Sequence, residues 1–214
     1  MRRKASGIGQ VVAYHIEENR SIYIFTIVLF LMGIIFGAII VNSLSLSQRN
    51  DLHIYLNQFF GQVAEGQLAD SAAMFSQSFA HYVKYIGLMW VLGLTIIGLP
   101  IILILLFIKG IVVGFTVGFL VNQLGMSGFL LSFASVMPQN FILVPAYIII
   151  TTCAVSFSLK MVRHQFIKRS HEPIFQQFLR YSALVVCIGA VLAIASAFEA
   201  YISPNLMRMV VNWM

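Results

Sequence analysis

Residues Ile86–Gln123 constrain this chain more than any other stretch. They form a run of 38 residues that holds one charge, at Lys109. As a single helix the run would extend about 57 Å, nearly twice the ~30 Å hydrocarbon core of a bilayer. A lysine near the membrane centre costs about 2.5 kcal/mol or more, so we expect the break at Lys109-Gly110, where the lysine would reach the headgroups. The run therefore predicts two membrane spans, 86–108 and 110–130.

The composition indicates that the rest of the chain is membrane-embedded as well. Hydrophobic residues make up 60% of the sequence and charged residues 9%, whereas soluble domains are about 25% charged. The basic segments are too short to form the folded face that a nucleic-acid-binding protein needs. The sequence thus predicts an all-α polytopic membrane protein, a single domain over 1–214, whose further spans lie at 22–41, 141–159 and 181–203.

The distribution of lysine and arginine predicts the orientation of these spans. Basic residues gather before the first span and again between 160 and 180, and such clusters favour the cytoplasm. With five spans, 10 of the 13 basic residues fall inside, including Lys109, and 3 fall outside. We therefore expect the N-terminus inside and the C-terminus outside, with 42–85 as the longest external segment.

Short amphipathic helices are expected on the membrane surface, at the two ends of the chain and within 42–85. In the external segment, apolar residues recur at helical spacing in two separate runs. Their aromatic faces either cover the protein's own spans and lipid or bind a partner. The candidate partner contacts are Phe59, Phe60, Phe75 and Phe79.

Glycines recur at four-residue spacing in two of the predicted spans. Gly110, Gly114 and Gly118 form one row, and Gly33 and Gly37 form another. In lipid such rows permit two helix backbones to approach closely, so they mark packed helix faces. The contact is either with another helix of the same chain or with a second protein or copy, and a homo-oligomer stays open.

The sequence contains no pattern typical of catalysis. It has no phosphate-binding loop, no H-E-x-x-H and no G-x-S-x-G. The five histidines lie outside the predicted spans without ligand spacing, so no catalytic, cofactor or metal site is expected. Glu199 is the one acid within a span and either has a function or reaches toward the headgroups. In this topology Lys109 lies at the opposite face, so we expect it to be an inner anchor that cannot pair with Glu199.

Long strings of this sequence resemble a known family, the stage II sporulation protein M family of endospore-forming bacteria. The resemblance covers nearly the whole chain and rests on the length of the strings, because no single motif is diagnostic. The strings are NRSIYIF (19–25), MGIIFGAIIVNSLSLSQ (32–48), FFGQVAEG (59–66), YIGLMWVLGLTIIGLPIILILLFIKGIVVGFTVGFLVNQLG (85–125), SVMPQNFILVPAYII (135–149) and AVSFSLKMVRHQFIK (154–168).

The resemblance implies a five-span, non-enzymatic scaffold in the cell membrane, at the sporulation septum and the engulfing membrane. There it would recruit the D and P stage II sporulation proteins, which are peptidoglycan hydrolases, for thinning of the septal wall. Many broader relatives carry Pro-His-Gly with a glutamate three residues further on. This chain has Pro138-Gln139-Asn140 and Leu143 instead, so the resemblance supports no proton or metal role there. The alternative function belongs to a different class, transport, in which the chain is a permease or channel subunit for a small solute or lipid.

Overall fold

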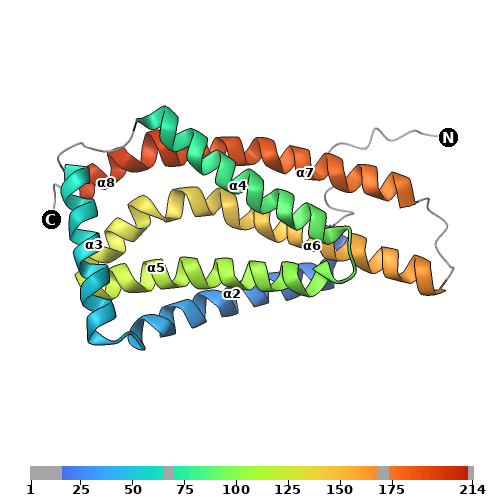
Figure 1. Ribbon diagram of the computed structural model, residues 1–214, viewed down its shortest axis with the longest axis horizontal. Helices are drawn as coiled ribbons and strands as arrows, with labels where there is room; N and C mark the ends of the chain where they lie inside the picture. The colour runs from blue at the N-terminus through green and yellow to red at the C-terminus, as the bar shows by residue number, and fades with distance from the viewer. Residues whose placement is uncertain (1–15, 65–69, 168–173, 212–214) are drawn as a thin grey trace.

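The computed structural model describes residues 16–64, 70–167 and 174–211, and this part of the chain is helical without any strand. Five long helices run side by side as a bundle, while a shorter helix, α3, lies across one end (Figure 1). We call this the α3 end. The long helices are α2 (Arg20–Asn42), α4 (Ser71–Gly93), α5 (Gly98–Ser135), α6 (Met137–Ile167) and α7 (Ile174–Ala197). The expected all-α fold is confirmed.

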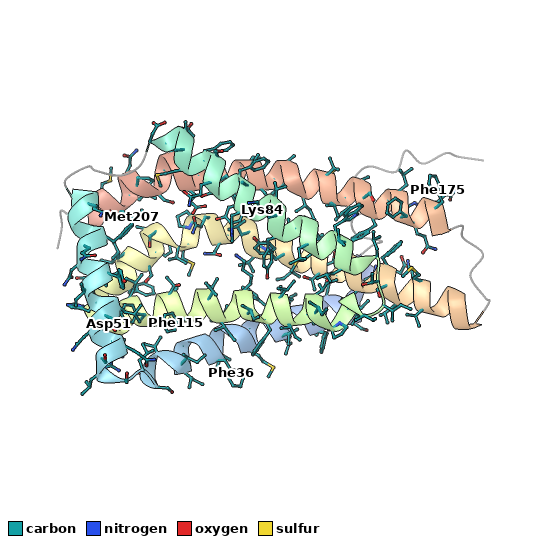
Figure 2. The ribbon with its side chains drawn as sticks, in the orientation of Figure 1. Phe36, Asp51, Lys84, Phe115, Phe175 and Met207 are labelled. Atoms are coloured by element: carbon teal, nitrogen blue, oxygen red, sulfur yellow. The ribbon has the colours of Figure 1, made fainter. Side chains whose placement is uncertain are left out.

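Two shorter elements complete the α3 end. Helix α3 spans Leu46–Ala64, and α8 spans Ser203–Val211. A π-helix over Phe198–Ile202 joins α7 to α8 without a loop. In Figure 2 Asp51 of α3 and Met207 of α8 mark this end, while Phe175 of α7 marks the opposite one.

Four stretches of helix are long and apolar enough to cross a membrane. They are Arg20–Asn42, Gly98–Ser135, Met137–Val162 and Phe175–Met207. The chain is therefore a multi-pass membrane protein. Helix α4 also runs along the bundle (Figure 1), but its N-terminal half carries polar side chains at Gln77, His81 and Lys84, which lower its hydropathy.

The chain turns at 94–97 rather than at Lys109-Gly110, so the expected helix over 86–108 does not exist as one helix. The Gly98 amide donates to the Thr95 hydroxyl oxygen at 3.0 Å, which closes the turn. Pro100 then falls in the first turn of α5, where its missing N–H leaves no helical bond unmade. Lys109 consequently lies within α5, about 17 Å from the start of that helix at 1.5 Å per residue.

The next break also differs from the expected span over 110–130. Gly125 adopts φ 58° and ψ −130°, which is outside helical geometry, and it bends α5. Positive φ values are readily available to glycine because it lacks a Cβ. The straight part of α5 is therefore 98–124, about 40 Å long, and this length is enough to cross a bilayer.

Three of the expected surface helices can be compared with the structure, and the one expected at the C-terminal end corresponds to α8. α3 is a separate helix across the end of the bundle (Figure 1). The second of the two helices expected within 42–85 is instead the first part of α4, which continues to Gly93 alongside α7. The helix expected over 1–20 lies mostly outside the described residues.

Helix α6 is the central helix. In its most apolar stretch 67% of the residues are buried, whereas in the other three apolar helices this share is 22–28%. Polar contacts join it to α2 and the residues just before α2. The hydroxyls of Thr26 and Thr152 lie 3.2 Å apart, and the Ser156 hydroxyl donates to Asn19 Oδ1 at 2.6 Å. Such bonds satisfy polar groups that the bilayer cannot. They fix the register of α2 against α6.

Candidate functional site: a charged cluster within the bundle

The glycine rows lie in the contact between α2 and α5 of the same chain. A Cβ added to Gly33 would lie 3.1 Å from the Gly110 Cα, and the reverse distance is also 3.1 Å. A Cβ on Gly37 or Gly114 would collide with backbone of the facing helix. Gly118 lies against Ala38. This seam of five glycines holds α5 at a fixed distance from α2 and thereby fixes the direction in which the rest of α5 faces.

Lys109 immediately precedes Gly110 in α5, and its ammonium lies over two aromatic rings. The ammonium nitrogen is 4.9 Å from the centroid of the Tyr85 ring and 5.2 Å from that of Tyr147. The Tyr85 hydroxyl donates to the Leu105 carbonyl at 2.6 Å, which holds its ring in place. A cation over an aromatic face is attracted by the ring quadrupole, and more strongly where water is excluded. The two tyrosines therefore partly compensate the lysine for its lost hydration.

Glu199 reaches the same region from the π-helix. Its Oε2 accepts a 2.5 Å hydrogen bond from the Tyr82 hydroxyl of α4. The π-turn lies just before Pro204, which has no N–H to continue the α-helical pattern. The Ser203 amide donates to the Phe198 carbonyl, five residues back, rather than to the Glu199 carbonyl. Single π-turns within helices occur frequently at functional sites.

The structure corrects the expected separation of Lys109 and Glu199. The two charges are close enough to attract each other, although they make no direct ion pair within the described residues. Lys109 is not an inner anchor, because the turn at 94–97 moves it about 17 Å into the bundle. An intramembrane charge is costly and commonly functional. We therefore take Lys109, Glu199 and the tyrosines Tyr82, Tyr85 and Tyr147 as the charged cluster.

A cleft of about 570 Å³ lies beside this cluster. Glu199 and Tyr82 contribute to its lining, and Lys84 lies midway along α4 on the same cleft (Figure 2). Lys84 and Glu199 are not paired with each other within the described residues. The other lining residues are Met74, Gln77, Ser78, Ala80 and His81.

The four aromatic residues expected to contact a partner fall in two places. Phe59 is on α3 and is 41% exposed, while the side chain of Phe60 lies outside the described part of the chain. Phe75 and Phe79 are on α4 and stack at 5.8 Å between ring centroids. Phe75 lines an apolar groove of about 520 Å³ with residues of α7 and the π-helix. The structure therefore separates the α3 aromatics from the α4 pair.

The tyrosines of the cluster were missed in the sequence. Their signal was weak, since Tyr82 and Tyr85 are three residues apart in a segment expected on the surface, and Tyr147 lies far along the chain. Among the described residues, no group of three or more His, Cys, Asp and Glu side chains could hold a metal ion.

Comparison with known proteins identifies one family. The family model for stage II sporulation protein M matches residues 26–204, from α2 to the start of α8. The matched region includes the glycine seam and every residue of the charged cluster. Neither the curated proteins nor the solved structures contain a match to the chain.

Proposed function

The chain belongs to the stage II sporulation protein M family, and we propose that it is a non-enzymatic scaffold that holds peptidoglycan hydrolases at the sporulation septum. Membership of this family implies a sporulation-related membrane protein. The proposal adds the location and the partners, namely the D and P stage II sporulation proteins. In the septum and the engulfing membrane, retention of both hydrolases would concentrate wall thinning where the membrane advances.

We further propose that α4 is a fifth span, so that the N-terminus lies inside and the C-terminus outside. The start of α2 and the end of α6 lie together at the end opposite α3 (Figure 1). At this end Lys160 pairs with Glu18 at 2.9 Å, and Arg20 begins α2. Basic residues favour the cytoplasmic side. The α3 end would then face outward, toward the wall.

The exposed apolar and aromatic side chains of α3 are the observation that carries the scaffold proposal. Leu46, Ile54 and Tyr55 on this helix are 80%, 54% and 70% exposed. Hydrolases act on peptidoglycan outside the membrane, so a partner surface must be at the outer end. Aromatic side chains, tyrosine among them, supply much of the energy of protein interfaces. α3 offers them on a helix that lies across that end (Figure 1).

Replacement of the exposed aromatics tests this surface. We expect Tyr55→Ser combined with Phe59→Ser to leave the protein inserted and abundant but unable to retain the D and P proteins. Co-purification of the three proteins from sporulating cells is the measurement, and Gln58→Ala, an exposed polar position on α3, is the matched control. Normal abundance with both hydrolases still bound would show that the partner surface is elsewhere.

A second candidate function, a permease or channel subunit for a small solute or lipid, is favoured by the charged cluster. Intramembrane charges often line substrate or ion pathways. Reconstitution into liposomes distinguishes the two functions, since a permease gives substrate-dependent flux and a scaffold gives none. Loss of that flux in Glu199→Gln would assign it to the cluster.

A further inference from the structure

We propose that the cleft beside Glu199 binds a zwitterionic group, in which a primary ammonium lies next to a phosphate or carboxylate. The ammonium would bind Glu199, and the anion would bind Lys84. This site goes beyond the scaffold function and does not depend on it.

The first argument is that the cleft holds opposite charges that do not pair with each other. Lys84 and Glu199 both line it, and within the described residues no ion pair joins them. Attraction between unlike charges is strong where water is scarce, and lysine has a long, flexible side chain. A purely structural pair would therefore be expected to close. Two unlike charges that line one cleft without pairing fit a ligand that carries both signs.

The second argument concerns the free oxygen of Glu199. Tyr82 donates to Oε2, and among the described residues no hydrogen bond reaches Oε1. Lys109 interacts electrostatically with Glu199 from the side of the bundle. Oε1 is thus left to accept an N–H from a ligand. A primary ammonium has such donors, whereas a quaternary ammonium has none.

The third argument is that the remaining lining suits an anion. Lys84 contributes a cation, and Gln77, Ser78 and His81 contribute further hydrogen-bond donors. The cleft volume of about 570 Å³ falls within the range of small-ligand sites. Tyr82 lies about 17 Å from the Gly93 end of α4, so the site would be at bilayer depth if α4 is a span as proposed. A lipid headgroup or a soluble molecule of the same chemistry could supply the ligand.

Lipid retention tests the proposal with the intact protein. Purified protein is placed in phosphatidylcholine nanodiscs that contain a minor share of either phosphatidylethanolamine or phosphatidylglycerol, and bound lipid is counted by native mass spectrometry. In a separate arm, soluble phosphoethanolamine is added in detergent and thermal stability is followed. A response in either arm supports the site, and the responding arm identifies the source of the ligand.

We expect phosphatidylethanolamine to be preferred over phosphatidylcholine about tenfold or more, as the loss of a charge-assisted hydrogen bond would predict. Glu199→Gln should remove the preference, and Lys84→Gln should lower the retention of both lipids, whereas Val83→Ala, on the exposed side of α4, should change neither. Lys84 is itself exposed, so its variant should fold normally. Equal retention in all variants, or stronger retention of phosphatidylglycerol than of phosphatidylethanolamine by the wild-type protein, would overturn the proposal. Hydrolase retention should be unchanged in both cleft variants, which separates this test from that of the scaffold.

Discussion

Lys109 and Glu199 show how single residues can carry charge inside an apolar bundle. Each is half-buried, and neither relies on one direct counter-ion. Two aromatic rings lie beside the lysine, and a tyrosine hydroxyl donates to the glutamate. Because several groups interact with each charge, the free-energy cost of removing either charge from water is reduced. The two residues should therefore depend on each other energetically.

A double-mutant cycle measures this dependence. We expect Lys109→Met to destabilise the protein by about 1–2 kcal/mol, because Glu199 then loses a nearby positive charge. Lys109→Met combined with Glu199→Gln should recover about 1 kcal/mol of that loss. Thermal unfolding in detergent or nanodiscs gives the values. Strict additivity of the two single changes would show that the charges are not coupled.

At the scale of elements, the seam between α2 and α5 could be predicted only in part. Four-residue glycine spacing at 110, 114 and 118 indicates a packed face whatever the fold. Its partner could not be identified from the spacing, since another copy of the chain would satisfy the same pattern. The choice depends on which helix the tertiary structure brings alongside, and that helix is α2.

A leucine in this seam should separate the two helices. Gly114→Leu places a side chain where the Ile34 backbone already lies, and backbone cannot move aside as a flexible side chain can. We predict a loss of about 2–3 kcal/mol in stability, measured by thermal unfolding. Val112→Leu, at a 52% exposed position on the same helix, is the control and should change stability little. If both variants unfold at the wild-type temperature, the seam is not a tight contact.

The helix boundaries show where prediction from sequence failed. The run 86–123 was correctly divided into more than one helix, because its length exceeds the bilayer. Its turn was misplaced, because the cost of Lys109 was judged without the neighbours Tyr85 and Tyr147, which only the tertiary structure supplies. The cleft was missed for the same reason, since its lining comes from helices far apart in sequence.

Cysteine labelling tests the corrected turn. With a maleimide that cannot cross membranes, Thr95→Cys should be labelled only after the cells are permeabilised, because the proposed topology places 94–97 at the inner end. Asn57→Cys on α3 should be labelled from outside. Lys109→Cys should resist labelling from either side, since it lies within the bundle. Rapid labelling of Lys109→Cys from inside would place the turn at 109–110 and contradict the structure.

The molecule as a whole combines a rigid bundle with a helix laid across one end. The glycine seam, the polar contacts of α6 and the charged cluster fix how the long helices pack, and α3 and α8 cover the end that we assign to the outside (Figure 1). Such an arrangement suits a protein that presents a surface at a fixed height above the membrane. Its main role would then be to bind other proteins.

Flotation of reconstituted liposomes tests this account most directly. Liposomes that contain the purified protein are mixed with the full-length D and P proteins in mild detergent, which is then removed, and the liposomes are floated on a density gradient. Empty liposomes and liposomes that carry Tyr55→Ser with Phe59→Ser control for direct insertion of the hydrolases. The account predicts that both hydrolases are enriched with the wild-type protein above both controls. Equal enrichment in all three preparations would contradict the scaffold function.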